Sequence, residues 1–277
     1  MSDFLATMAE SSSARAQAAE QVRGFADLMM AAESMSQGPR LALSTEFDVI
    51  AEIKANSPAE GALADQATLD RAVQASDYAS GGACAVSVLT EPDRFAGTLE
   101  HLVLVAKTLA PMNVPAMRKD FLVNEYQIVE ARVAGAGGVL LIVAMLDNAR
   151  LTNMLARARQ LGLFVLLECF DRDDLARACA LLDSSTVAEM ISDGRFMLGI
   201  NTRNLRSLAV DSDRLRSLAP QLPDGVVCVA ESGLKTPEDV GLVVEWGYRA
   251  ALIGTALMKS ASPARLVREF VAAGRDR

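Results

Sequence analysis

The feature that most constrains this chain is an unbroken alternation of strand and helix patterns from about residue 47 to 273. The strand patterns cover residues 47–54, 84–89, 114–118, 138–143, 163–168, 196–201, 226–230 and 250–254, and the helical patterns cover residues 67–80, 97–109, 125–135, 148–161, 172–182, 212–219, 236–246 and 263–273. Several strands, such as 138–143, are apolar on both faces, which is typical of parallel strands covered by helices. Eight such units in series favour a (β/α)8 TIM barrel over an open doubly wound sheet. The absence of Gly-x-Gly-x-x-Gly after the first strand also weakens the dinucleotide-binding alternative.

The segments outside this alternation predict an N-terminal extension and one irregular connection. The chain of 277 residues exceeds the size of one barrel, about 250 residues. Residues 1–45 have a helical composition, so we expect a helical extension packed on a catalytic barrel of residues 46–277, with one mouth of the barrel as a candidate position. The alternative is a loosely ordered arm. Residues 183–195 are long for a helix-to-strand link and predict an insertion at the bottom face of the barrel.

Composition excludes several classes of function. The net charge of −8 argues against nucleic acid or an anionic membrane as a partner. His101 is the single histidine, so a histidine triad and a multi-histidine metal site are excluded. We see neither an apolar run of about 18 residues nor a signal-peptide pattern. We therefore expect a cytoplasmic protein, either a monomer or a weak homodimer.

The first strand carries two charges on one face. Alternation places Ile50, Glu52 and Lys54 together, opposite the apolar Val49 and Ile53. Charges on an interior surface are costly unless they are paired. The plain alternative is an ion pair on an edge strand.

Polar residues recur where the other strands end, which is where barrel active sites lie. These strand-end segments are Arg118-Lys119-Asp120-Phe121, Glu168, Asn201-Thr202-Arg203, Glu231-Ser232-Gly233 and Gly254-Thr255, with Ser57 in the loop after the first strand. Lys119 and Glu168 are the best candidates for an acid–base pair, because a lysine can protonate a carbonyl oxygen while a carboxylate moves the complementary proton.

The loops after the seventh and eighth strands predict a phosphate site. Their small residues let backbone N–H groups approach a ligand closely, and these two loops form the usual barrel phosphate site. Taken alone, Ser232-Gly233 or Gly254-Thr255 is equally compatible with an ordinary tight turn.

These motifs together resemble the indole-3-glycerol-phosphate synthase family. The resemblance runs from about residue 47 to 272, includes the N-terminal extension, and rests on Ala51-Glu52-Ile53-Lys54-x-x-Ser57-Pro58, Ser87-Val88-Leu89-Thr90, Arg118-Lys119-Asp120-Phe121, Tyr126-Gln127-Ile128-x-Glu130-Ala131-Arg132, Gly199-Ile200-Asn201-x-Arg203-Asn204-Leu205 and Glu231-Ser232-Gly233-Leu234-x-Thr236-Pro237-Glu238-Asp239. It implies a carbon–carbon lyase of tryptophan biosynthesis. Such an enzyme closes the indole ring of 1-(2-carboxyphenylamino)-1-deoxyribulose 5-phosphate with loss of carbon dioxide and water, and it uses no cofactor or metal.

The resemblance also implies a role for each site residue. Lys119 is the implied general acid on the ketone oxygen, Glu168 its proton-transfer partner, and Glu52 and Asn201 their catalytic support. The implied substrate-binding residues are Lys54, Ser57 and Arg203 for the anionic ends, Gly233, Gly254 and Thr255 for phosphate, Phe121 and Leu234 for the aromatic ring, and Glu231 and Ser232 beside them.

Three departures from the family pattern keep alternatives open. Ala55 stands where an arginine is usual, Glu60 where a basic residue is usual, and Thr202 where an asparagine is usual. These departures leave open the alternative that the protein is a paralogue, which acts on a substituted anthranilate derivative in a secondary pathway. A non-catalytic barrel that binds phosphorylated metabolites is a further alternative. A phosphoribosylanthranilate isomerase is disfavoured, because that enzyme typically uses a Cys–Asp pair.

Overall fold

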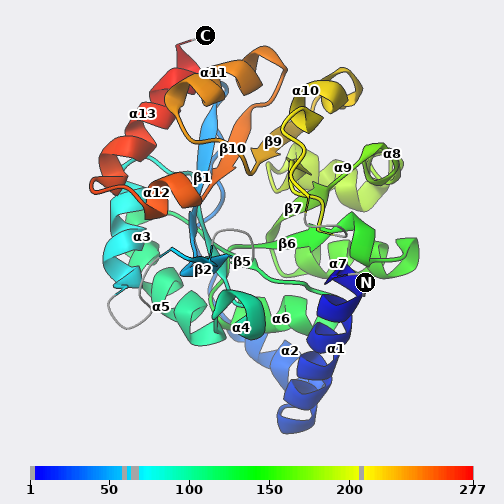
Figure 1. The fold of residues 1–277 in the computed structure, drawn as a ribbon. Helices are drawn as coiled ribbons and strands as arrows, with labels where there is room; N and C mark the ends of the chain where they lie inside the picture. Colours follow the sequence, from blue (N-terminus) through cyan, green and yellow to red (C-terminus); the bar gives the residue numbers. More distant parts are fainter. Residues whose placement is uncertain (1–3, 58–60, 64–68, 206–208, 277) are drawn as a thin grey trace.

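Eight parallel strands form a closed barrel in the computed structural model, which describes residues 4–57, 61–63, 69–205 and 209–276 (Figure 1). The strands are β1 Asp48–Ile53, β4 Ala85–Leu89, β5 Ala116–Lys119, β6 Gly138–Ile142, β7 Phe164–Cys169, β8 Phe196–Asn201, β9 Val227–Glu231 and β10 Ala250–Ile253. β1 pairs with both β4 and β10, and this pairing closes the sheet. The predicted (β/α)8 TIM barrel is confirmed, and the ends of each predicted strand agree with the structure to within two residues.

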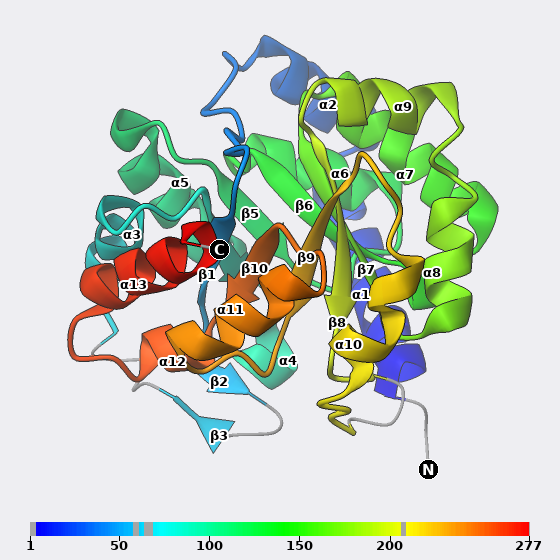
Figure 2. The same ribbon diagram turned by 90° about the horizontal axis from the view of Figure 1, so that it is seen from above.

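Helices surround the barrel on its outside, as the view turned by 90° shows (Figure 2). They are α3 Arg71–Ser80, α5 Leu99–Leu109, α6 Glu125–Val133, α7 Asn148–Gln160, α8 Arg172–Cys179, α9 Ser185–Ser192, α10 Arg214–Leu218, α11 Pro237–Glu245 and α13 Pro263–Arg275. Shorter elements follow four of the strands: the β2 Asn56–Ser57 and β3 Gly61–Ala62 hairpin after β1, α4 Pro92–Phe95 after β4, the 3-10 helix η2 Val143–Met145 after β6, and α12 Thr255–Met258 after β10. Among the helices of the described residues, none combines the length and the apolar character that crossing a membrane requires.

The alternation of β1 separates two apolar layers. Val49 and Ile53 belong to the layer between strands and helices, whereas Ile50 belongs to the layer inside the barrel. Glu52 therefore points inward, as predicted. A closed barrel has no edge strand, so the edge-strand alternative for this ion pair is wrong.

The N-terminal extension is docked on the barrel. Its helices α1 Phe4–Val22 and α2 Phe25–Ser34 pack against α6 (Figure 1). The amide of Gln127 donates a hydrogen bond of 2.8 Å to Ser12 Oγ, and the Tyr126 hydroxyl donates one of 3.0 Å to the carbonyl oxygen of Arg23. The described part of the extension therefore belongs to the folded body, and the alternative of a loose arm is wrong for residues 4–34.

The segment expected to hold an insertion forms a second helix, α9, in the connection between β7 and β8, after α8. The Ser184 side chain caps α9, which packs against α7 and β8, and Glu189 of α9 forms an ion pair with Arg159 of α7. An eight-residue helix with Ser and Thr in its first turn is short for detection by hydrophobic periodicity.

Candidate active site

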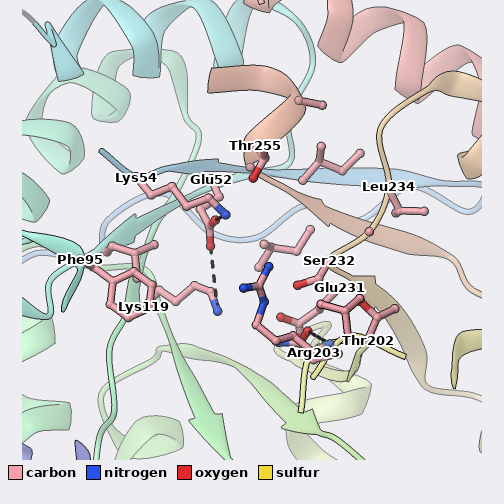
Figure 3. A pocket seen from close by; sticks show the side chains of 18 of the residues that line it. Glu52, Lys54, Phe95, Lys119, Thr202, Arg203, Glu231, Ser232, Leu234 and Thr255 are labelled. Carbon is pink, nitrogen blue, oxygen red and sulfur yellow. Dashed lines mark hydrogen bonds and ion pairs between the residues drawn. The ribbon is translucent and has the colours of Figure 1, made fainter. Parts of the chain in front are cut away.

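A cavity of about 940 Å³ lies at the C-terminal ends of the strands (Figure 3). Twelve of the predicted site residues line it: Glu52, Lys54, Lys119, Phe121, Asn201, Arg203, Glu231, Ser232, Gly233, Leu234, Gly254 and Thr255. They come from five strands and the loops that follow them, so segments far apart in the sequence meet in one place.

Among the predicted site residues whose side chains the structure describes, Glu168 lies outside this lining. Glu168 is fully buried beneath the cavity. Ser57 lies in β2, where its backbone pairs with Gly61, and its side chain is outside the described part of the structure. Glu60 also falls outside the described residues.

Glu52 lies between two lysine side chains. Its Oε1 atom is 2.7 Å from Lys54 Nζ, and its Oε2 atom is 4.0 Å from Lys119 Nζ (Figure 3). Burial raises the pKa of Glu52, but the two ammonium groups outweigh burial and hold the pKa below its usual range. Glu52 is therefore a carboxylate at neutral pH.

Lys119 connects the cavity to Glu168. Its Nζ atom is 3.5 Å from Glu168 Oε2, and its side chain is 15% exposed whereas that of Glu168 is fully buried. Burial lowers the pKa of Lys119, but Glu168 and Glu52 outweigh burial, so the net shift is upward. Lys119 is therefore a charged ammonium group, with a proton available at the cavity wall.

Glu231 differs from the other two glutamates. Its side chain lies at the cavity wall, but both carboxyl oxygens are buried. Burial and the neighbouring Glu168 raise the pKa of Glu231 well above its usual range, although Lys119 opposes them. Three glutamates in one site thus have different electrostatic surroundings.

The loop after β9 makes a left-handed turn. Ser232 has a φ of 66° and Gly233 a φ of 84°. Positive φ is unfavourable for a serine, and such strained residues concentrate at functional sites. In the loop after β10, a Cβ atom on Gly254 would overlap the carboxyl group of Glu52. Both loops therefore bring backbone close to the cavity.

Residues at the end of β8 are held by a network that sequence reasoning missed. Asn201 Oδ1 accepts a 2.9 Å hydrogen bond from the backbone N–H of Arg203. The Arg214 guanidinium donates hydrogen bonds to the carbonyl oxygens of Asn201 and Thr202, at 2.8 and 2.9 Å. Arg203 itself points into the cavity (Figure 3).

Aromatic and aliphatic side chains form an apolar wall of the cavity. The ring of Phe121 lies 5.9 Å from that of Phe4 and 6.1 Å from that of Phe95. The lining residues that sequence reasoning missed include Phe4, Phe95, Leu140, Ile142, Leu205, Lys235 and Lys259. Alternation in β6 gives a signal for Leu140 and Ile142, because they share one strand face. Phe4 gives no such signal, since its position depends on how α1 docks.

The fold and the site together define a class: a (β/α)8 barrel whose C-terminal mouth holds a buried lysine–glutamate network beside two small-residue loops. A model of the indole-3-glycerol phosphate synthase family matches residues 5–270. The chain therefore belongs to the indole-3-glycerol phosphate synthase family.

Curated relatives and solved structures agree with this assignment. An indole-3-glycerol phosphate synthase from Nocardioides sp. is 47% identical over 80% of this chain and 79% of its own. The protein of that name from Parafrankia sp. is 43% identical over 85% of this chain and 83% of its own. A 3-hexulose-6-phosphate synthase structure from Salmonella typhimurium has a TM-score of 0.59 and 13% identity, and covers 82% of this chain and 98% of its own. At that identity it shows the shared fold alone.

Proposed function

We propose that the protein is a carboxy-lyase of tryptophan biosynthesis, which converts 1-(2-carboxyphenylamino)-1-deoxyribulose 5-phosphate to indole-3-glycerol phosphate, carbon dioxide and water. The observation that carries the proposal is the Lys119 ammonium group at the cavity wall, 3.5 Å from the buried Glu168 carboxylate. The names of the relatives support the same reaction.

The first step forms the carbon–carbon bond. The ring carbon that bears the carboxylate attacks the ketone carbon, and negative charge develops on the ketone oxygen. Lys119 donates a proton to that oxygen, and Lys54 and Glu52 keep the surrounding charge balanced. Carbon dioxide then leaves, and its departure restores the aromatic ring.

The second step removes the hydroxyl group as water. A proton is added to the leaving oxygen and another is removed from the neighbouring carbon atom. Lys119 first takes a proton from solvent, in place of the one that it gave to the ketone oxygen. We then assign this exchange to the Lys119–Glu168 pair, because one member again holds a proton and the other is an acceptor in contact with it. The substrate neither gains nor loses electrons to a partner, so the reaction as written requires no redox cofactor.

Substrate binding divides the cavity into two ends. We place the phosphate group against the backbone of Ser232, Gly233, Gly254 and Thr255, with Lys54 or Arg203 as its counter-ion. We place the aromatic ring against Phe121, on the wall that Phe4 and Phe95 share. Leu234 lines the cavity on the side of Ser232 and Thr255 (Figure 3). The separation of anionic and aromatic ends fits a substrate that has both.

The direct test is turnover of the carboxyphenylamino-deoxyribulose phosphate, followed by the fluorescence of the indole product. We expect Lys119→Ala to lower kcat by at least ~10²-fold. Lys107→Ala is the matched control, because Lys107 is exposed on α5, and it should retain full activity. Ligand binding without turnover by the unmodified protein would reject the lyase and favour the non-catalytic barrel.

A second candidate reaction follows from a departure from the family pattern at the cavity. Thr202 stands where an asparagine is usual, it lines the cavity, and its Oγ1 atom is buried without a hydrogen-bond partner among the described residues. A paralogue would use the same steps on a ring-substituted anthranilate derivative. A higher kcat/KM for such a compound than for the unsubstituted substrate would establish it.

A further inference from the structure

Glycine in β8 allows two glutamate side chains to meet across a strand. Glu168 of β7 is in register with Gly199 of β8, and Glu231 of β9 is in register with Asn201, two residues further along the same face of β8. A Cβ atom on Gly199 would overlap Glu231 Oε1 and would lie 3.0 Å from Glu231 Cδ. The Glu231 carboxyl group therefore occupies the space that Gly199 leaves open, on the side of Glu168.

The two carboxyl groups have more acceptor atoms than the surrounding donors satisfy. Both oxygens of Glu168 and both oxygens of Glu231 are buried, and none of the four accepts a hydrogen bond from the described residues. Glu168 is 0% exposed and Glu231 is 1% exposed. Glu168 Oε2 has an ion-pair partner in Lys119 at 3.5 Å, whereas the other three oxygens have no ion-pair partner among the described residues. Buried polar atoms are nearly always paired, so these oxygens require an explanation.

The nearby cations lie closest to Glu52 and Glu168 rather than to Glu231. Lys54 is committed to Glu52 at 2.7 Å. Lys119 lies 3.5 Å from Glu168 and 4.0 Å from Glu52. Arg203, which also lines the cavity, acts on Glu52 as well. A third buried carboxylate at Glu231 would have Lys119 as its main opposing charge, and Lys119 is shared with Glu168 and Glu52. Such a group is far more stable when it is protonated.

We propose that Glu231 is a neutral carboxylic acid at neutral pH and donates an O–H···O hydrogen bond to the Glu168 carboxylate. This hydrogen bond gives one buried oxygen of each carboxyl group a partner. It leaves the negative charge on Glu168, which contacts Lys119. Glu231 is then a positioning residue. It holds Glu168 against Lys119 rather than binding substrate through its carboxyl oxygens, and this catalytic consequence rests on the proposed function.

The groups that face Glu231 are consistent with this state. Glu168 on β7 and Glu52 on β1 disfavour a negative charge there, and Lys119 on β5 favours it. The adjacent strands contribute Asn201 and Leu252, which are uncharged. Burial and the two carboxylates outweigh the lysine, so the balance raises the pKa of Glu231.

Infrared spectroscopy of the unliganded protein tests the protonation state without any assay of activity. We expect a C=O stretching band of a protonated carboxylic acid at neutral pH, separate from the carboxylate bands. Glu231→Gln and Glu168→Gln should each abolish this band, because the remaining glutamate then pairs with Lys119 as a carboxylate. Glu52→Gln should retain it. Absence of the band from the unmodified protein, or its persistence in both single variants, overturns the proposal.

Activity then decides which glutamate holds the proton. A glutamine at 231 is neutral and can donate N–H to Glu168, so we expect its kcat to stay within roughly threefold of the unmodified enzyme. Glu231→Leu lacks the donor, and Glu168→Gln lacks the base, so each should lose at least ~10²-fold. Ionisation of Glu231 should also lower kcat at alkaline pH, and Glu231→Gln should lack this decline.

The possible outcomes separate the two proposals. Equal losses in the glutamine and leucine variants at position 231 overturn the positioning role. Lack of turnover by the unmodified protein rejects the proposed reaction, but it leaves the infrared result valid as evidence on the proton.

Discussion

The guanidinium group of Arg15 on α1 binds both carboxylate oxygens of Asp120, which directly follows Lys119. Arg15 Nη1 lies 3.2 Å from Asp120 Oδ2, and Arg15 Nη2 lies 3.0 Å from Oδ1. Asp120 also accepts hydrogen bonds from Thr90 at 2.8 Å and from Arg118 at 3.2 Å. The N-terminal extension is thus attached to the segment that carries the candidate general acid.

Removal of this attachment should destabilise the fold. Arg15→Met leaves the buried Asp120 with one guanidinium partner instead of two, and we expect a loss of about 1–3 kcal/mol in the free energy of unfolding. Urea unfolding at pH 7 measures it. Arg265→Met is the matched control, because the Arg265–Glu269 pair is exposed, and it should change stability by less than about 1 kcal/mol. Equal effects of the two substitutions would contradict the assignment.

The effect of Arg15→Met should also depend on pH. Burial raises the pKa of Asp120, but Arg118 and Arg15 outweigh burial and hold it below its usual range. A depressed folded-state pKa stabilises the protein above the unfolded value of about 3.9, and this stabilisation is lost as pH falls through the folded-state pKa. The stability difference between Arg15→Met and the unmodified protein should therefore shrink below about pH 4.

Gly199→Ala should disturb the site without adding a charge. The new Cβ atom would displace the Glu231 carboxyl group and contact Leu166 Cδ1 at 3.1 Å. We expect a loss of about 1–3 kcal/mol in stability from overpacking and a fall in kcat of up to ~10²-fold from misplacement of Glu168. Gly38→Ala is the control, since a Cβ atom there meets open space. Unchanged kcat in Gly199→Ala would show that Glu231 need not lie over β8.

Glu231→Gln should gain stability relative to the unmodified protein as pH rises. Burial beside Glu168 raises the pKa of Glu231 in the folded state. Above the unfolded value of about 4.3, the unfolded chain releases this proton while the folded chain keeps it, which lowers stability by up to about 1.4 kcal/mol per pH unit. Glutamine removes this penalty. Chemical unfolding at pH 5 and pH 8 should show a larger advantage for Glu231→Gln at pH 8, and a constant difference would contradict the raised pKa.

Phe4→Ala should weaken substrate binding more than catalysis. Phe4 lines the cavity and contacts the ring of Phe121 edge-on. We expect KM to rise roughly threefold to tenfold with little change in kcat, because an aromatic contact contributes about 0.5–1.5 kcal/mol. Val22→Ala lies on the same helix but is 91% exposed, so it should leave KM unchanged. A fall in kcat alone would argue for a role of Phe4 in chemistry.

Sequence patterns predicted the barrel because its units are local. Strands such as residues 138–143 are short, apolar and followed by a helical pattern. Their secondary structure therefore follows from residues nearby in the sequence. The helix within residues 183–195 was not predicted, because α9 has eight residues, little more than two turns, and Ser and Thr in its first turn. Lys119 and Asn201 were identifiable as site candidates because they stand at the C-terminal ends of strands, and all parallel strands of a barrel end at the same mouth.

The sequence by itself determined the number and order of the strand–helix units, the inward face of Glu52 and the set of charged strand ends. Only the tertiary structure decided that Glu168 lies beneath the cavity against Lys119 and that the Glu231 carboxyl group lies over β8 at Gly199. It also decided that Phe4 of the extension lines the cavity and that Arg15 binds Asp120. The reason is physical. Secondary structure and face follow from local periodicity, whereas burial, proximity of charges and the pKa of a carboxyl group depend on which distant segments pack together.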